Sequence, residues 1–377
     1  MRTTHVPEEG ARIDIRESGI VPARDRGEDS ALAAAVTLRA PRPGLNEFGR
    51  SLASCGDLLL IGCRQDDRNP FAVLYRITDQ GLVRERLLRG AEGHQGPSLA
   101  TDGERVAVGQ PAADGSTGFA CVYRRKGTEL ELEAMIEGKP DEANGQRVGE
   151  KVAIGDGLLV LGQPASVDVY RHAAVGWLAA GSLQPELPYA YNPGYGQSIA
   201  VLAGRVLVGN PIEINGHRAG SGRVFVYRPE GDQMVLEAEL LGDGIESGRA
   251  EPPLPGFGAS IQTHGEYAII TAPRELSITG APQSRVYVFR AVGRELQRVA
   301  ALDVPSCQGG ASMVGDKLLV LGTDALYAFT RVGDSFQALA TYAVENASQT
   351  TVSSVGRLVA LSSPEDGAVE MMFAEQL

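Results

Sequence analysis

The chain contains an internal repeat that is anchored by pairs of glycines. In the first copy Gly49 and Gly62 are thirteen positions apart, and four later copies keep this spacing. A sixth copy has Thr271 in place of the second glycine, and the seventh has neither glycine. The first anchors of the seven copies are Gly49, Gly96, Gly149, Gly196, Gly258, Gly309 and Gln349. A series of repeated supersecondary units predicts one repeat fold rather than several separate domains.

Each copy predicts four short antiparallel strands. The first strand ends in a tight glycine turn, such as Gly56 with Asp57 or Gly155 with Asp156, where glycine supplies a positive φ. The second strand is apolar at every position, as in residues 58–61, and such a strand is buried on both faces. The fourth strand alternates between polar and apolar residues, as in residues 129–134, so one of its faces meets water. An inner and an outer strand of a propeller blade have these two patterns.

The last copy ends at its third strand, near Phe373, and lacks a fourth. Residues 27–38 resemble the turn and fourth strand at residues 333–341 of the sixth copy. We therefore expect residues 31–38 to complete the blade of residues 358–373, which leaves no open sheet edge. The prediction is an all-β, seven-bladed β-propeller of four-stranded antiparallel blades over residues 27–377, preceded by a polar N-terminal tail at residues 1–26.

Two motifs in the repeat match a known family. Phe48-Gly49 and Phe257-Gly258 form one motif, with Tyr195-Gly196 as a variant. The second motif is Gly109-Gln110-Pro111, Gly162-Gln163-Pro164, Gly209-Asn210-Pro211 and Thr271-Ala272-Pro273. Over residues 27–377 the sequence resembles the FG-GAP repeats of integrin α-chains and of many bacterial proteins. This resemblance implies a seven-bladed propeller, often one that serves adhesion or ligand binding.

The resemblance does not extend to the calcium loop of integrin-type blades. That loop joins the first two strands and is rich in Asp, which suits a cation that takes six or more oxygen ligands. Here the same place holds only the tight glycine turn. We therefore expect no metal ion and no cofactor.

Composition restricts the partners and the location. The formal net charge of −12 repels phosphate backbones, so nucleic acid is not expected. No stretch is apolar and long enough for a membrane span, and the N-terminus has no apolar signal core. The cytoplasm is the expected location, with export that uses no cleavable signal left open. The four cysteines lack CxxC spacing, and we expect free thiols.

No catalytic constellation is recognisable. The five histidines fall in different copies or in the tail, without metal or triad spacing, and neither a phosphate loop nor a GxSxG motif is present. An enzyme with a site in the central channel is the least favoured alternative, because the first strands show no converging carboxylates or histidines. A carbohydrate-binding or adhesion propeller is the second alternative, since aromatic residues recur at the end of the third strands, although they have the pattern of core residues.

Five arginines follow the third-strand aromatics. They are Arg76, Arg124, Arg171, Arg228 and Arg290. One hypothesis is a cationic arc for an acidic ligand, and the other is a set of charged strand ends that keep the sheet edges soluble.

The longest connections all belong to one predicted face. They are residues 184–193, 210–222, 243–256 and 272–284, in the third to fifth blades, and loops often carry binding function. An apolar patch with a charged rim is typical of a protein interface. We therefore predict a non-enzymatic scaffold, either a complex subunit or a neutralising partner of another protein, with a glycan as a possible ligand. The predicted partner-binding residues are Tyr189, Tyr191, Ile212, Glu213, Ile214, Arg218, Arg249, Leu254, Arg274, Glu275 and Leu276.

Overall fold

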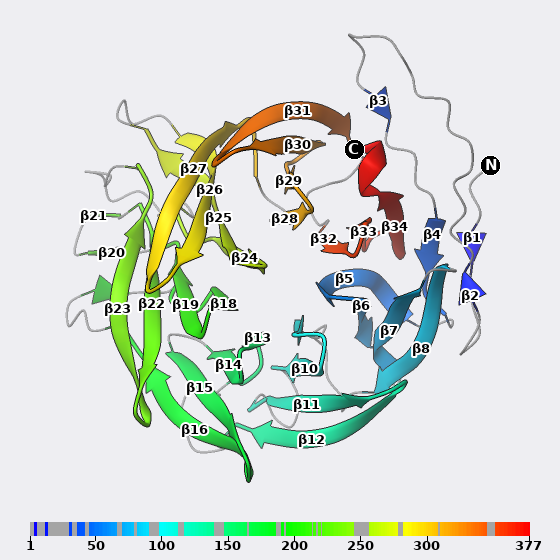
Figure 1. Ribbon diagram of the computed structural model, residues 1–377, viewed down its shortest axis with the longest axis horizontal. Helices are drawn as coiled ribbons and strands as arrows, with labels where there is room; N and C mark the ends of the chain where they lie inside the picture. The colour runs from blue at the N-terminus through cyan, green and yellow to red at the C-terminus, as the bar shows by residue number, and fades with distance from the viewer. Residues whose placement is uncertain are drawn as a thin grey trace.

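The strands form a closed ring of blades around a central axis (Figure 1). The computed structural model describes residues 4–5, 12–13, 30–31, 36–41, 45–65, 70–78, 81–89, 98–111, 117–138, 147–163, 166–185, 190–191, 194–212, 214–215, 218–219, 221–244, 256–277, 282–307, 310–344 and 351–377. Within these residues the predicted seven blades of four antiparallel strands are confirmed. A single 3-10 turn, η3 (Ala374–Gln376), follows the last strand.

The first four blades follow the chain in order. The first contains β5 (Leu45–Cys55), β6 (Leu58–Gln65), β7 (Pro70–Thr78) and β8 (Gly81–Arg89). The second contains β9 (Ser98–Thr101), β10 (Arg105–Gln110), β11 (Phe119–Lys126) and β12 (Glu129–Glu137). The third contains β13 (Lys151–Gly155), β14 (Leu158–Gln163), β15 (Ser166–Ala173) and β16 (Gly176–Leu183). The fourth contains β18 (Ser198–Leu202), β19 (Arg205–Asn210), β22 (Arg223–Glu230) and β23 (Gln233–Leu241).

The remaining three blades complete the ring. The fifth contains β24 (Ser260–His264), β25 (Tyr267–Leu276), β26 (Pro282–Val292) and β27 (Glu295–Val304). The sixth contains β28 (Ala311–Val314), β29 (Lys317–Leu321), β30 (Ala325–Val332) and β31 (Ser335–Ala343). The seventh contains β32 (Val352–Val355), β33 (Leu358–Ser363), β34 (Ala368–Phe373) and, from the other end of the chain, β4 (Val36–Arg39).

The second strand of each blade packs against both neighbouring blades. In β6, Leu59 and Ile61 belong to the core between the seventh and first blades, whereas Leu58 and Leu60 belong to the core between the first and second. All four side chains are fully buried. One such core lies between each pair of adjacent blades in the described chain. Burial on both faces is therefore the physical reason for the continuous apolar runs.

The tight turns differ from the prediction in two blades. Gly56 has a φ of 62° and begins its turn, as expected. In the third blade the turn is formed by Asp156 and Gly157, with φ values of 49° and 73°, instead of Gly155 and Asp156. In the fourth blade it is formed by Ala203 and Gly204, at 50° and 70°. A hairpin turn with positive φ at both central positions favours Asp-Gly, which explains the shift by one residue in the third blade.

The anchor glycines lie where the backbones of adjacent blades meet. A Cβ added to Gly209 at the end of the fourth blade's second strand would lie 2.3 Å from the carbonyl oxygen of Gly258, which opens the fifth blade. A Cβ on Gly109 would lie 2.2 Å from the carbonyl oxygen of Gly149, in the same relation between the second and third blades. The two glycines of one copy therefore serve two different seams, one with the preceding blade and one with the next.

The N-terminal segment closes the ring as predicted. β4 pairs antiparallel with β34, and Val36 lies opposite Met371. The closing strand is shorter than residues 31–38, because β3 (Ser30–Ala31) pairs instead with β31 of the sixth blade. Within the predicted tail, β1 (Thr4–His5) pairs with β4 and β2 (Arg12–Ile13) pairs with β8. The blue N-terminal strands accordingly lie along the outer edge of the ring in Figure 1.

Shortening a core side chain of the closing strand should weaken the whole fold. Leu38 is fully buried in β4, so Leu38→Ala should lower the free energy of unfolding by about 2–5 kcal/mol. Leu339→Ala is the matched control, because Leu339 is 47% exposed on β31 and should cost about 1 kcal/mol or less. Urea unfolding of both variants measures the difference. Equal losses would mean that β4 is not part of the cooperative core.

Adding one methyl group at a blade seam should also be costly. In Gly209→Ala the new Cβ would meet the hydroxyl of Ser198 at 2.1 Å and the Gly258 carbonyl, so we expect a loss of about 1–3 kcal/mol. Gly155→Ala is the control, because its Cβ would make an ordinary 3.5 Å contact with Val201. Thermal or urea unfolding compares the two. A Gly209→Ala variant as stable as the control would contradict the role of the seam.

Candidate functional site

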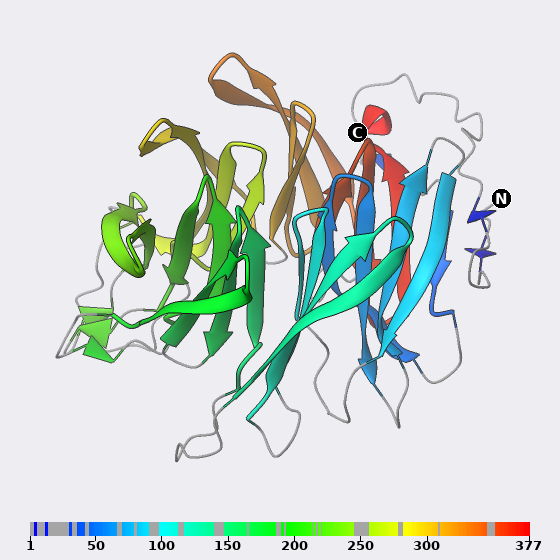
Figure 2. The same ribbon diagram turned by 60° about the horizontal axis from the view of Figure 1, so that its bottom comes forward.

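The long connections of the third to fifth blades leave the ring on the same face. Strand directions place the loops between second and third strands, and the links between blades, at one end of the blades, opposite to the tight turns. This loop-bearing face is the lower one in Figure 2, and the C-terminus lies at the upper one. The arc of long connections is wider than expected, since residues 138–150 between β12 and β13 also belong to it. The loop that connects β25 to β26 is shorter than expected, because strand pairing continues to Leu276.

A small extra sheet joins two of these connections. β17 (Ala190–Tyr191) comes from the link between the third and fourth blades, and β20 (Ile214–Asn215) and β21 (Arg218–Ala219) come from the loop within the fourth. Tyr191 is the register partner of Ile214, and Asn215 is that of Arg218. Three predicted residues from two connections, Tyr191, Ile214 and Arg218, are therefore brought into one sheet, which lies beyond the outer strand β23 (Figures 1 and 2).

The bases of the same connections are held together by backbone contacts. A Cβ on Gly194 would lie 2.8 Å from the amide nitrogen of Ile212, so the link and the loop touch there. The amide of Gly256 donates to the carbonyl of Pro211 at 3.0 Å, and the amide of Phe257 donates to that of Ser221 at 2.8 Å. These bonds tie the loop of the fourth blade to the link that leads to the fifth.

Glu275 is a correction to the predicted rim of the patch. Its side chain is fully buried rather than exposed, and its carboxylate accepts hydrogen bonds from the Tyr287 hydroxyl at 2.5 Å and the Gly244 amide at 2.8 Å. The Tyr287 oxygen accepts in turn from the amide of Asp243 at 2.8 Å. A buried carboxylate needs such partners, so Glu275 fastens the β25–β26 hairpin to the link from the fourth blade.

Arginines add a second layer to this attachment. Arg285 Nη1 lies 3.0 Å from Asp243 Oδ2, and Arg298 Nη1 lies 2.6 Å from Asp243 Oδ1. Burial raises the pKa of the Tyr287 phenol above its ordinary value, so the hydroxyl remains a donor to Glu275 at neutral pH. The Asp243–Tyr287–Glu275 group thus holds the base of the link in one place.

The other predicted interface residues divide into three groups. Arg274 is exposed on β25, and Ile212 is half-buried beside Gly194. Leu276 ends β25. The rest lie outside the described residues: Tyr189, Glu213, Arg249 and Leu254.

The arginines of the opposite face are paired with carboxylates. Each of the five predicted arc residues has an acidic neighbour: Arg76 with Glu85, Arg124 with Glu104, Arg171 with Asp232, Arg228 with Glu230, and Arg290 with Glu266. Pairing cancels most of the positive field that an acidic ligand would need. This arrangement favours the interpretation as charged strand ends.

One polar cluster on the turn face was not foreseen. Glu133 of β12 lies 2.9 Å from Arg105 Nε, and its other oxygen lies 3.2 Å from His172 Nε2. Trp177 Nε1 donates to Glu133 at 3.1 Å. Burial opposes the charge on Glu133, but the hydrogen bonds from Arg105 and Trp177 outweigh it and lower the pKa of the carboxyl. Arg205 and Glu237 repeat the ion pair within the fourth blade at 2.7 Å, whereas the contacts of Glu133 with His172 and Trp177 join the second blade to the third.

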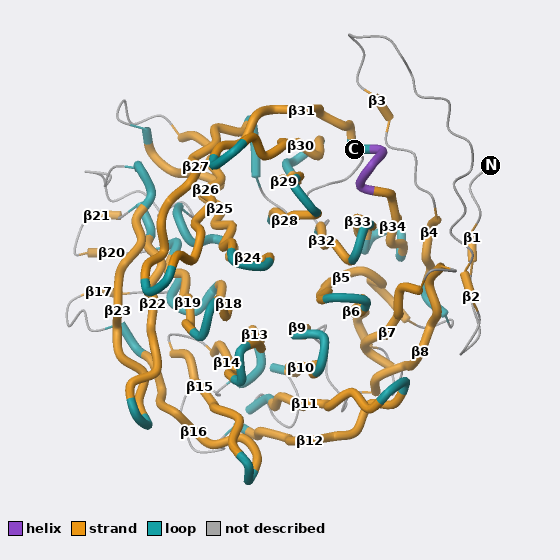
Figure 3. The backbone as a smooth tube through the Cα atoms, viewed as in Figure 1, coloured by secondary structure: helices purple, strands orange, loops and turns teal. Residues whose placement is uncertain are grey.

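The first strand of each blade lies nearest the central axis of the ring (Figure 3). Residues of these strands line a second candidate site, the central channel. The cavity has a volume of about 400 Å³ and is lined by residues of all seven inner strands. No Asp or Glu is among these lining residues; Lys151 and His264 are the ionisable ones. Desolvation lowers the pKa of His264 below its ordinary value, so its imidazole is neutral at pH 7. The converging carboxylates that a channel enzyme would need are not found in this lining.

Other catalytic and metal chemistry has little support in the described part of the chain. No group of three His, Cys, Asp or Glu side chains there could hold a metal ion. None of the four cysteines is in a disulfide, and burial raises the pKa of the Cys63 and Cys307 thiols to about 12. A thiol with so high a pKa is a poor nucleophile. Of the elements that the structure describes, no helix has the length and apolarity to cross a membrane.

Comparison with known proteins shows a similarity of fold alone. No family model and no curated protein matches the chain. A chain in the crystal structure of the mitotic checkpoint complex is similar with a TM-score of 0.57 and 9% identity, covering 95% of this chain and 99% of that one. The β-propeller domain of Myceliophteria thermophila Cps50 (Swd1) has a TM-score of 0.57 and 10% identity, over 90% and 99%. The WD40 domain of Toxoplasma gondii coronin has 0.50 and 11%, over 86% and 80%.

The salt bridge between the first two blades allows a test by pH. Arg125 donates two hydrogen bonds to Asp57, at 2.8 and 2.9 Å, and this lowers the pKa of that carboxyl below its usual value. The stabilisation is present above the unfolded-state pKa of about 3.9 and is lost as pH falls through the lower folded-state pKa. Because Asp57 is partly exposed, Asp57→Asn should cost less than about 1 kcal/mol at pH 7.

Urea unfolding from pH 7 to about pH 3 measures the difference in unfolding free energy between the unchanged protein and Asp57→Asn. This difference should shrink as Asp57 becomes protonated. Asp232→Asn is the control, because the Asp232 side chain is fully exposed where it faces Arg171. A difference for Asp57→Asn that stays constant over the whole pH range would contradict the assignment.

Proposed function

We propose that the protein is a non-enzymatic protein-binding scaffold that uses the loop-bearing face of its third to fifth blades. The carrying observation is the continuous set of contacts at the bases of the long connections. Gly194 touches Ile212, Pro211 bonds to Gly256, and Gly244 bonds to Glu275. These contacts hold together the bases of four successive connections, which supports the proposal that the connections act as one surface, as a protein interface requires.

The kind of partner is part of the same proposal. The chain would bind another protein, either as a subunit of a complex or as that protein's neutralising partner. Tyr191, Ile212 and Ile214 would be the apolar anchors. One similar structure is part of the mitotic checkpoint complex, so a propeller of this shape does occur in a protein assembly. The proposal includes a location in the cytoplasm and membership of the FG-GAP repeat family, of the bacterial type. The anchor glycines at the seams support that membership.

The carbohydrate alternative loses its main support. Sugar sites stack on exposed aromatic faces, but five third-strand rings, those of Tyr75, Tyr227, Phe289, Phe329 and Phe373, are buried in the cores between blades, and Tyr123 and Tyr170 are half-buried there. This burial speaks against a repeated sugar platform on the third strands.

Two substitutions on the proposed surface should weaken partner binding. Tyr191→Ala and Ile212→Asp should each cost roughly 1–4 kcal/mol in binding free energy, because apolar anchors at the centre of an interface carry most of its affinity. The partner is first identified by cross-linking in the native source. Affinity is then measured with purified components, and a thermal melt checks that each variant stays folded.

Arg228→Ala serves as the control, since Arg228 is exposed on the opposite face of the same blade and pairs with Glu230. This variant should bind as the unchanged protein does. A cross-linking footprint that lies wholly on the turn face, or on the first, second, sixth and seventh blades, would overturn the proposal.

A further inference from the structure

One repeat position of the channel wall holds a lysine in a single blade. Two residues after the anchor glycine, the first, second, fourth and fifth blades each have a serine: Ser51, Ser98, Ser198 and Ser260. The third blade has Lys151 at this position, at the start of β13. All five residues line the same cavity. A cation therefore stands at a position that four other blades fill with serine.

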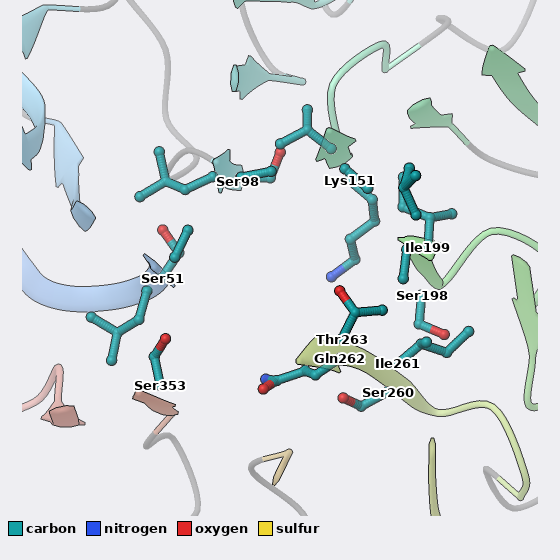
Figure 4. A pocket seen from close by; sticks show the side chains of 18 of the residues that line it. Ser51, Ser98, Lys151, Ser198, Ile199, Ser260, Ile261, Gln262, Thr263 and Ser353 are labelled. Atoms are coloured by element: carbon teal, nitrogen blue, oxygen red, sulfur yellow. The ribbon is translucent and has the colours of Figure 1, made fainter. Parts of the chain in front are cut away.

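The serines and the lysine have different surroundings. Ser98 and Ser198 donate to the carbonyls of Gly149 and Gly258 in the following blades, each at 2.7 Å, so their protons are used in the seams. Lys151 extends its side chain into the channel, and its ammonium group points toward Thr263 and Gln262 (Figure 4). No carboxylate of the described chain forms an ion pair with Lys151.

On one side of the channel wall the polar side chains have hydrogen-bond partners, and on the other side they could bond to a ligand. Where the sixth, seventh and first blades meet, serines bond to one another: Ser54 to Ser353 at 2.7 Å, and Ser312 to Ser354 at 3.0 Å. On the side of the fifth blade, the side chains of Ser260, Gln262 and Thr263 have no hydrogen-bond partner among the described residues. Lys151, Thr263 and Gln262 point into one part of the cavity, whereas Ser260 lies on the other side of β24, beside Gly310 (Figure 4).

We propose that the channel binds a small hydroxylated anion, a carboxylate or a phosphate ester, whose charged group meets Lys151. The amide of Gln262 and the hydroxyl of Thr263 would then bond to its oxygens. A cavity of about 400 Å³ is within the range for small-molecule ligands. The absence of lining carboxylates removes the repulsion that the net charge of −12 produces elsewhere on the molecule. This site is separate from the proposed protein interface and does not depend on it.

Isothermal titration calorimetry tests the proposal with three probes. These are D-gluconate, inorganic phosphate, and D-glucitol as the uncharged counterpart of gluconate. We expect saturable binding of at least one anion with one site per chain, weaker at high ionic strength, and no binding of glucitol. The preferred anion distinguishes a carboxylate site from a phosphate site.

Variants locate the bound anion. Lys151→Gln should weaken binding at least tenfold, whereas Lys151→Arg should retain part of it because the charge remains. Lys126→Gln is the control, since Lys126 is exposed on β11 and pairs with Glu131 away from the channel. The bound anion should also protect Lys151, but not Lys126, from acetylation detected by mass spectrometry. Failure of both anions to saturate, or unchanged binding in a folded Lys151→Gln protein, would overturn the proposal.

Discussion

Close approach of the backbone between neighbouring blades is the constraint on which this ring depends. At the seam between the fourth and fifth blades, Gly209 and Gly258 leave no room for a Cβ, and Ser198 bonds to the Gly258 carbonyl across the same gap. Gly109, Gly149 and Ser98 repeat the arrangement between the second and third blades. Because a glycine pair spans one tight hairpin, its spacing stays constant while the connections outside it vary in length. The seams thus explain why the anchor glycines are the clearest sign of the repeat in the sequence.

The same seams determine where variation is tolerated. The anchor glycines lie at the end of the blades where the connections enter, so long insertions begin directly beside a rigid element. Gly256 and Phe257 bond to the loop of the fourth blade just before Gly258 opens the fifth. Glu275 then attaches the hairpin of the fifth blade to the same link. A surface built from loops can bind specifically only when their bases are fixed in this way, since the entropy of ordering them would otherwise oppose binding.

The ring and its closure could be predicted from sequence because they rest on periodic signals. The glycine spacing, the apolar second strands and the unpaired third strand near Phe373 each have one physical interpretation. Glu275 could not be placed, because a charged residue after a proline resembles a loop residue until its partners Tyr287 and Gly244 are known. The channel site was missed although its signal is present: Lys151 replaces the serine found at the same repeat position of four other blades. Ala31 was assigned to the wrong blade because two adjacent sheet edges were available to a short segment.

Closure of the ring by β4 is the central claim, since every seam and every loop base depends on a complete circle of blades. Hydrogen–deuterium exchange of the purified monomer tests it most directly. The account predicts that amides of Val36–Arg39 are protected to a similar degree as those of β33 and β34, with which they share a sheet and a core. Rapid exchange of Val36–Arg39 beside protected β33 and β34, or protection that appears only as protein concentration rises, would contradict it.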